Sequence, residues 1–314
     1  MNEMTINDIN AMTAASHESF VIDGEAGYDK MLRDVADSLC RHAKDRPITL
    51  IAGPSASGKT TTAHRIEQIL DAWGFETHTL SMDNYYADGT RNADVVDQNG
   101  KPDYESPLRL DTDLLNTQLR QLAMGEEVEL PRFDFANQKQ CKSGVMLRRK
   151  KGELILMEGI HALNPEVAEG VHDTSSKIYL SVRTRITDGD RRLHPSLIRF
   201  ARRLLRDSRT RGRDAAESCK MLASVSRGEN LYIMPYKHLA DYELDTFLPY
   251  ELGVYKPFLL DTLRNLATSD AAEGTDIPLL LSFMEKIAPI EEPEWIPDIS
   301  VIREFIGGTA LFRE

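Results

Sequence analysis

The chain has 314 residues, 41% hydrophobic and 28% charged, which is typical of a soluble globular protein with a sizeable core. Its net charge of −12 excludes a nucleic-acid surface spread over the whole molecule, although a local basic site stays open. Cys40, Cys141 and Cys219 lie far apart without a CxxC pair, and no apolar run approaches the roughly 20 residues of a membrane span. With a polar, acidic N-terminus that is not a secretory signal, free thiols and a cytoplasmic location are expected.

The first third of the chain alternates predicted helices and strands. Residues 1–27 lack strong periodicity and are predicted to form a loose arm or a short docking element, followed by a helix at 28–42. The apolar run at 47–52 ends at glycine, as a buried parallel strand does. A helix is predicted at 60–73 and a second strand at 75–82. The side chains expected on the buried face of that helix are Ala63, Ile66, Ile69, Leu70 and Trp73.

The same alternation continues to residue 306. Asp111 is a fair N-cap for a helix that runs to Met124 and ends at Gly125. The segments 127–135 and 144–149 alternate apolar and polar residues and are predicted to pair as a hairpin. The remaining predicted elements are strands at 154–157 and 177–182 and helices at 195–209, 215–225, 251–267, 279–287 and 301–306.

This order of elements predicts an α/β fold with a P-loop NTPase-type parallel sheet covered by helices on both faces. Three ranges are expected. An N-terminal arm and helix occupy 1–45, the main domain occupies 46–267, and a helical extension without a catalytic role occupies 268–314.

The sequence GPSASGKT at 53–60 satisfies the pattern GxxxxGK[ST] completely. Glycines let successive N–H groups face a triphosphate, and the following helix presents its positive end to the same anion. We expect Lys59 to reach the β- and γ-phosphates and Thr60 to hold Mg²⁺. A simple turn is the alternative, but a predicted strand precedes the loop and an amphipathic helix follows it. No NKxD-type guanine motif is present, which favours ATP. The predicted ATP-binding residues are Gly53, Pro54, Ser55, Ala56, Ser57, Gly58, Lys59, Thr60 and Thr61.

Two carboxylates stand where predicted strands end. Glu158 follows an apolar run, a position from which an acid can hold Mg²⁺ or its water. Asp83 follows the second strand and could accept the proton of an attacking hydroxyl during phosphoryl transfer. Either acid alone could be a solvated side chain or a helix cap, but beside an intact P-loop both are candidates for the site.

An arginine-rich segment predicts a lid. Between Arg191 and Arg213 there are nine arginines and a single acid, Asp207, and Gly212 could serve as a hinge. A helical wheel separates apolar Leu197, Ile198, Ala201, Leu204 and Leu205 from Arg199, Arg202, Arg203 and Arg206. Such a stripe in an acidic protein is expected to bind phosphates. A solvated face with ion pairs is the alternative, and RNA binding is disfavoured because the stripe carries almost no aromatic residues.

Six motifs in one order resemble the uridine kinase and phosphoribulokinase family of P-loop kinases between about residues 47 and 257. They are GPSASGKT, DNYY at 83–86, DYESP at 103–107, ELPRFDF at 129–135, MEGIHAL at 157–163 and RRLLRDSRTRGRD at 202–214. The nearest likeness is to the bacterial uridine-kinase-like (nucleoside kinase) branch, which shares SMDNYY, EGIHALNP, SRGENLYIMPY at 226–236 and IREFIGG at 302–308.

The resemblance implies roles for individual residues. Asp83 would be the general base and would act with Lys59, Arg206 and Arg211, while Thr60 and Glu158 would hold Mg²⁺. A small β-hairpin would cover the acceptor and the arginine-rich helix would be the lid. The acceptor would be bound by Tyr86, Glu105, Phe133, Gln138, Arg203 and Arg213, with Glu105 in place of an aspartate on the ribose hydroxyls.

The departures from the family fall in the base pocket. Uridine–cytidine kinases show YDFxxH, whereas this chain has FDFANQ at 133–138, so Phe133 replaces the tyrosine and Gln138 the histidine. A glutamine that helps to read the pyrimidine would align near Met221. Lost hydrogen-bond partners change the discrimination between substrates by orders of magnitude.

These patterns predict an ATP- and Mg²⁺-dependent kinase that acts on the 5′-hydroxyl of a nucleoside resembling uridine or cytidine. One alternative is phosphorylation of another small alcohol, such as a sugar, a sugar phosphate or a pantothenate-like compound. Another is a nucleotide-binding regulatory or RNA-associated protein, which would not need an acid beside the γ-phosphate. The expected partner is a small molecule, with no membrane or nucleic acid, and a homo-oligomer stays open.

Overall fold

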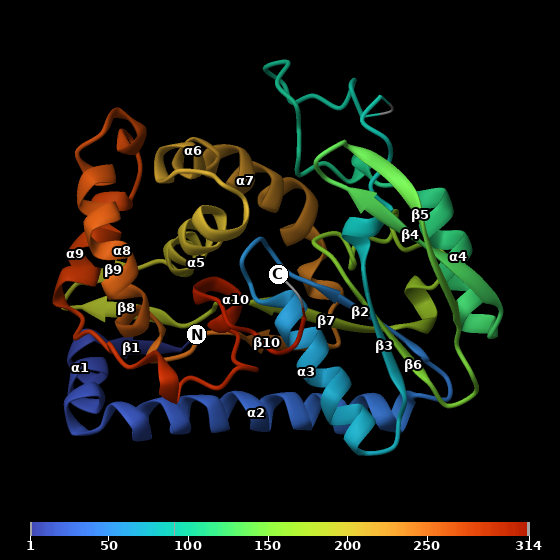
Figure 1. Ribbon diagram of the computed structural model, residues 1–314, viewed down its shortest axis with the longest axis horizontal. Helices are drawn as coiled ribbons and strands as arrows, with labels where there is room; N and C mark the ends of the chain where they lie inside the picture. Colours follow the sequence, from blue (N-terminus) through green and yellow to red (C-terminus); the bar gives the residue numbers. More distant parts are fainter. Residues whose placement is uncertain (1, 91, 313–314) are drawn as a thin grey trace.

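A computed structural model describes residues 2–90 and 92–312. Its centre is a parallel sheet of five strands in the order β10–β7–β2–β6–β3 (Figure 1). The strands are β2 (Ile48–Ala52), β3 (Thr77–Ser81), β6 (Leu154–Glu158), β7 (Ser176–Ser181) and β10 (Tyr242–Asp245). The first four confirm the predicted strands, and β10 was not predicted. Every residue of β2 and β6 is buried, as expected for central strands covered on both faces.

Two hydrophobic clusters lie on opposite faces of this sheet. Ile51 of β2 packs with α2 (His17–His42), α3 (Lys59–Ala72), α5 (Pro195–Thr210) and α8 (Glu251–Ala267), whereas Leu50 packs with α4 (Thr112–Met124). Successive side chains of a strand point to opposite faces, so neighbouring residues of β2 serve different cores. The α/β fold with helices on both faces of a parallel sheet is confirmed.

The helix boundaries follow their predicted caps. Asp111 accepts a hydrogen bond from the Leu114 N–H at the start of α4, and Gly125 ends the helix with φ +78°. The predicted apolar side of α5 is buried throughout. Trp73 was wrongly placed on the buried face of α3, because the helix ends at Ala72 and the ring is 42% exposed.

The N-terminal segment is not a loose arm, the first of the two predicted alternatives, but regular structure that docks on the rest of the protein. It forms β1 (Glu3–Thr5) and α1 (Ile6–Ala15), and α2 begins at His17 instead of residue 28. Gly24 lowers the helix propensity there, but a Cβ at this position would lie 2.9 Å from the ring of Tyr250, so the glycine permits close packing. The Tyr250 hydroxyl donates to Glu25 at 2.6 Å, and Arg65 of α3 lies 3.1 Å from the same carboxylate. The contacts that Tyr250 and Arg65 make with Glu25 therefore stabilise this part of α2 despite the low helix propensity of glycine.

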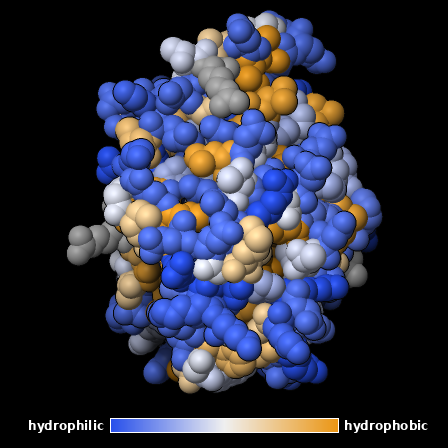
Figure 2. Space-filling view, turned by 90° about the vertical axis from the view of Figure 1, so that its right-hand side faces the viewer, coloured by the Kyte–Doolittle hydropathy of each residue, from blue (hydrophilic) through white to orange (hydrophobic). Residues whose placement is uncertain are grey.

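Two smaller sheets flank the main one. Strand β1 pairs in parallel with β8 (Arg185–Asp188), which pairs antiparallel with β9 (Arg191–Leu193). The predicted hairpin is confirmed as β4 (Glu127–Asp134) and β5 (Lys139–Arg148), with a second strand that starts five residues earlier than expected. The face that carries α4 and the hairpin is mostly hydrophilic, with apolar side chains gathered in its upper part (Figure 2).

The remaining elements follow α5. The predicted helix at 215–225 is broken at Met221 into α6 (Ala215–Lys220) and α7 (Leu222–Gly228). The C-terminal part forms α9 (Ile277–Lys286) and α10 (Arg303–Ile306), near the predicted ranges. The short 3₁₀ and π turns are η1 (Met82–Tyr85), η2 (Pro107–Arg109), η3 (His172–Thr174), η4 (Glu229–Ile233), η5 (Met234–Leu239), η6 (Asp270–Ala272) and η7 (Pro293–Trp295).

The N- and C-terminal segments share one hydrophobic cluster with α3 and α5, although the division into three ranges stays a prediction. None of the helices in the described part of the chain has the length and apolar character that a membrane span requires. The three cysteines are free thiols, as predicted.

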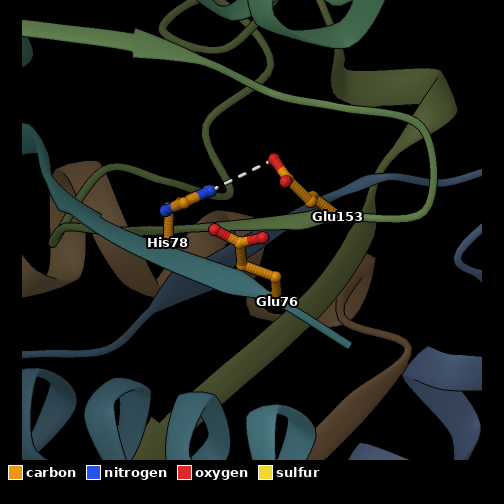
Figure 3. A group of neighbouring side chains, drawn as sticks. All are labelled: Glu76, His78 and Glu153. Carbon is orange, nitrogen blue, oxygen red and sulfur yellow. Dashed lines mark hydrogen bonds and ion pairs between the residues drawn. The ribbon is translucent and has the colours of Figure 1, made fainter. Parts of the chain in front are cut away.

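Glu76, His78 and Glu153 gather where β3 and β6 begin, at the end of the sheet opposite the P-loop (Figure 3). His78 Nε2 lies 3.3 Å from Glu153, and the Lys150 ammonium lies 3.1 Å from Glu153 and 3.6 Å from Glu76. Burial would raise the pKa of Glu153, but hydrogen bonds from Lys150 and His78 lower it to about 2. A lysine thus already supplies the cation that these carboxylates require, and we interpret the group as an ion-pair network that joins two strand ends.

Candidate active site

The P-loop connects the end of β2 to the first turn of α3. Its backbone passes so close to β7 that a Cβ at Gly53 would overlap the carbonyl oxygen of Leu180. Ala56 and Gly58 take positive φ angles of 59° and 80°, which turn the chain back toward the helix. The loop is thus curved as an anion cradle requires, with the N-terminus of a 14-residue helix behind it.

Lys59 is surrounded by charged groups from four segments. Its Nζ donates to the Pro54 carbonyl at 3.2 Å, which holds the side chain along the loop. Burial lowers the pKa of Lys59, while the nearby carboxylates of Glu158 and Asp83 oppose that shift. The ammonium therefore lies between the two acids that the sequence singled out, and its charge is available to phosphate oxygens.

Thr60 and Glu158 form an oxygen-rich pair at the carboxyl end of β6. The Thr60 hydroxyl donates to Glu158 Oε1 at 3.3 Å. Burial, opposed by the charge of Lys59 and helped by that of Asp83, raises the pKa of Glu158 to about 7. A buried carboxylate that is not fully neutralised by its surroundings, next to a hydroxyl oxygen, fits a hard cation such as Mg²⁺.

Asp83 lies in η1, directly after β3. The Ser81 hydroxyl accepts a hydrogen bond from the Asp83 N–H and fixes this turn, and Gly159 allows Met82 to pack tightly against the end of β6. The carboxylate of Asp83 is exposed, but its charge acts on Lys59 and on Tyr86. Asp83 is therefore near enough to both Lys59 and Tyr86 for its charge to influence each of them.

A buried aspartate organises the arginines at the end of α5. Asp207 is fully buried and lies 3.4 Å from Arg203, 3.5 Å from Arg206 and 3.4 Å from Arg211. Arg206 also reaches Ser55 of the P-loop at 3.4 Å. Burial lowers the pKa of Arg211, as does the charge of Arg206, while Asp83 raises it. The two predicted catalytic arginines are thus held by one carboxylate beside Asp83.

The predicted arginine stripe is wrong in one respect, because it does not form a single phosphate-binding face. Arg202 is fully buried, its guanidinium pairs with Glu251 at 2.7 Å, and it donates to the Ala56 carbonyl at 3.3 Å. Arg199 pairs with Glu229 at 2.6 Å and donates to the Ser55 carbonyl at 3.1 Å. Both arginines hold the P-loop backbone, since α5 is covered by other segments on its polar side too.

A cavity of about 260 Å³ opens between α5, α7 and residues 274–276. Ser55, Arg199 and Arg203 are among the side chains that line it. The cavity therefore lies beside both α5 and the P-loop.

Three aromatic rings form a wall near Asp83. The ring of Tyr86 lies 5.5 Å from Phe133 and 6.0 Å from Phe135, and the two phenylalanines lie 5.0 Å apart. Burial raises the pKa of Tyr86 well above its usual value, and the charges of Asp83 and Glu105 add to that shift. Tyr86 thus lies between the two carboxylates, with an aromatic surface beside it on which a planar ring could stack.

Glu105 is buried against α7. A Cβ at Gly228 would overlap the Cβ of Glu105, so the glycine makes room for this side chain. Burial raises the pKa of Glu105, and the charge of Arg203 counters that shift. The loop that carries Glu105 is fixed through Asp103, which accepts from the Tyr232 hydroxyl at 2.9 Å and pairs with Arg227 at 2.9 Å.

Three other predicted residues lie in different surroundings. Gln138 is exposed in the β4–β5 turn, and its amide donates to the Phe135 carbonyl at 2.8 Å. Arg213 follows α5, and its backbone N–H donates to the Asp207 carbonyl at 3.2 Å. Met221 stands at the break between α6 and α7. The structure brings the catalytic set together, whereas the Gln138 amide is engaged in its own turn.

Several residues near the site were not singled out from the sequence. His161 is buried, and burial lowers its pKa to about 4, so the ring is neutral beside the backbone of Glu105 and Tyr232. Glu304 accepts a hydrogen bond from Thr61 at 2.8 Å. A usable signal existed for Asp207, the single acid among nine arginines, whereas Glu229, Glu251 and Glu304 lie far along the chain from their partners.

Known proteins match most of this chain. The family model described as Phosphoribulokinase / Uridine kinase family matches residues 48–247. A uridine kinase from Staphylococcus aureus (strain JH9) is 34% identical over 192 residues, which cover 61% of this chain and 83% of that protein. The uridine kinase of strain Newman gives the same values.

Two solved structures are more distant. A possible uridine kinase from Bacillus stearothermophilus shows 21% identity and a TM-score of 0.43, covering 68% of this chain and 99% of that one. A D-glycerate 3-kinase from Cryptococcus neoformans shows 14% identity and a TM-score of 0.35, covering 88% of each chain.

Proposed function

Since the chain belongs to the phosphoribulokinase/uridine kinase family of ATP-dependent kinases, we propose that it transfers the γ-phosphate of ATP to the 5′-hydroxyl of a nucleoside. The observation that carries this proposal is the position of Asp83. Its charge acts on Lys59 of the P-loop on one side and on Tyr86 of the aromatic wall on the other. A base in that place faces both a donor phosphate and an acceptor hydroxyl.

In the proposed reaction the acceptor hydroxyl gives its proton to the Asp83 carboxylate while its oxygen attacks the γ-phosphorus. The bond between the γ-phosphorus and the β–γ bridging oxygen breaks, and ADP leaves with that bridging oxygen. Lys59, Arg206 and Arg211 offset the charge that develops on the phosphoryl oxygens and on the leaving group. Thr60 and Glu158 would hold Mg²⁺, which would supply positive charge to offset that of the phosphate oxygens.

Two groups of side chains around Tyr86 suit a nucleoside. Glu105 offers a buried carboxylate, the group that commonly accepts hydrogen bonds from ribose hydroxyls, and Arg203 keeps its charge balanced. The rings of Tyr86, Phe133 and Phe135 offer a stacking surface for a base. Stacking tolerates different bases, so we expect selectivity that is broader than that of a strict uridine–cytidine kinase.

The test is a panel of ribonucleosides, deoxyribonucleosides, sugars and sugar phosphates, with ADP release followed for each at a fixed concentration of Mg²⁺-ATP. We expect several ribonucleosides to be phosphorylated, and the deoxyribonucleosides to react more slowly because Glu105 loses a hydroxyl partner. If every nucleoside is inert and a sugar phosphate or another alcohol is turned over efficiently, the nucleoside half of the proposal is wrong.

Phosphorylation of another small alcohol is the second candidate. The Gln138 amide donates to the Phe135 carbonyl, so one of its donors is engaged within its own turn. One carboxylate and three rings, with few groups to read a base, also suit a sugar or a pantothenate-like alcohol. A nucleotide-binding regulator would instead show no acceptor-dependent ADP release with any compound of the panel.

The lid arginines give a prediction about kinetics. We expect the double variant Arg206→Gln/Arg211→Gln to lower kcat more than it raises the KM for ATP, because lid contacts form fully only when the site closes. Steady-state rates over a range of ATP concentrations measure both constants. Tm is also expected to fall, because two of the three arginines around the buried Asp207 lose their charge, although the apolar side of α5 stays buried.

Arg192→Gln is a matched control, since this arginine is 65% exposed and lies in β9, away from the P-loop. A large fall in Tm with unchanged kinetics of the double variant would instead assign Arg206 and Arg211 to the scaffold.

A further inference from the structure

The C-terminal segment 300–308 lies against the first turn of α3. A Cβ at Gly58 would come within 2.8 Å of the Val301 side chain, so the two backbones approach closely. The Thr61 hydroxyl donates to Glu304 Oε2 at 2.8 Å. The charge of Glu304 also acts on Lys59 and Glu158. A segment more than two hundred residues away in sequence thus touches the residues that begin the phosphate site.

The lid helix holds the same segment from its other side. Figure 1 shows α10 between α5 and the start of α3. The Arg209 guanidinium lies so close to Gly307, whose φ is +93°, that a Cβ there would overlap it, and Arg209 donates to the Phe305 carbonyl at 3.4 Å. Arg202 stacks over the Phe305 ring at 5.3 Å. The C-terminal segment is therefore packed between α3 and α5.

The first turn of α3 has two sides with different neighbours. Lys59 and Thr60 face Glu158 and Asp83, where the γ-phosphate must lie for transfer. Thr61 is the next residue and faces Glu304. Because the γ-phosphate end of ATP points to Asp83, its nucleoside end must leave the P-loop in another direction, and the Thr61 side of the turn leads to Glu304.

The charges of Lys59 and Arg202 attract a carboxylate at this place, whereas a bound triphosphate would repel it. Glu304 is half-buried beside a loop built to hold a triphosphate, and like charges in that position repel. The repulsion is offset if the carboxylate accepts hydrogen bonds from neutral hydroxyls. Acidic residues commonly bind ribose hydroxyls in this way, and a carboxylate has two oxygens, so it can keep Thr61 as a partner.

We propose that Glu304 accepts a hydrogen bond from a ribose hydroxyl of ATP, and that the Gly307–Gly308 turn and Arg209 lie against the adenine base of the same nucleotide. The inference rests on the ATP-binding part of the proposed function and is independent of the acceptor. No catalytic role was predicted for the extension at 268–314. The proposed contact would let this extension help to select the phosphoryl donor.

The test compares ATP, 2′-deoxyATP and 3′-deoxyATP in the full-length protein. We expect the wild type to bind and use ATP better than at least one deoxy analogue by about 10- to 100-fold, as befits one hydrogen bond to a charged group. In Glu304→Ala the preference should fall to about threefold or less, and in Glu304→Gln, which keeps one acceptor oxygen, it should be intermediate. Glu273→Gln, at an exposed glutamate of the same extension, should keep the wild-type preference.

Two results would overturn the inference. Either the wild type uses the three nucleotides equally, or Glu304→Ala weakens all three by the same factor, as a loss of structure would. Thermal unfolding is followed in parallel, and Glu304→Gln remains available if Glu304→Ala does not fold. Binding is measured by calorimetry without an acceptor. A ribose preference that depends on Glu304 would therefore stand even if no nucleoside were phosphorylated.

Discussion

The Lys59→Ala variant is expected to lose at least about 10²-fold of kcat, because charge placed against the transferring phosphoryl group supplies several kcal/mol in the transition state. The fold should survive. Apart from its ion-pair surroundings, the Lys59 ammonium has one hydrogen bond in the described structure, to the Pro54 carbonyl, and burial already lowers its pKa. Turnover with the best acceptor of the panel, together with circular dichroism and Tm, measures both effects.

The matched control is Lys151→Ala, which removes an exposed lysine from the turn before β6. It should leave turnover and Tm near wild type. If Lys59→Ala keeps more than about a tenth of the wild-type rate, the assignment of this lysine to the phosphates is wrong.

The second large effect is expected for Asp83→Asn. Removing the general base should slow transfer by about 10²–10⁴-fold while changing the affinity for ATP little. The amide keeps the shape of the side chain, and the turn is held by the Ser81 hydroxyl and the backbone, not by the carboxylate. Single-turnover rates and equilibrium binding of ATP separate the two effects.

Asp173→Asn is its control, because that carboxylate is fully exposed in η3 and should not influence either measurement. Collapse of ATP binding in Asp83→Asn, with a normal rate for the complex that still forms, would identify Asp83 as a metal ligand or a structural residue.

Regular segments were predictable because their signals are local. Strands β2 and β6 are nearly continuous apolar runs, β7 is apolar at its centre, and α5 and α8 repeat apolar residues at helical spacing. Strand β10 was missed because only Leu244 of its four residues is buried, so it carries no such run. The start of α2 was misplaced because glycine weakens the local helix signal, while Tyr250 and Arg65 fix the helix from outside.

The site residues also divide into those with a local sequence signal and those that depend on distant partners. Lys59, Thr60, Asp83 and Glu158 stand in short motifs at strand ends, and the structure brings them together. The glutamates that hold the arginines could not be assigned. Arg202 pairs with a residue 49 positions away, and a helical wheel treats its side of α5 as solvated. Whether a charge is exposed or paired depends on which segments pack over the helix, and a single sequence does not show that packing.

The bond between Thr61 and Glu304 joins residues 243 positions apart in the chain. During synthesis the P-loop emerges long before the segment that packs against it, and early parts of a chain begin to fold while later parts are still being made. The contact also closes a very long loop, which adds to the entropy that folding must overcome and slows the last steps. The end of the nucleotide site beside Thr61 is therefore completed only after nearly all of this chain has been synthesised, so nascent chains carry a P-loop whose first helical turn is still open to solvent on that side.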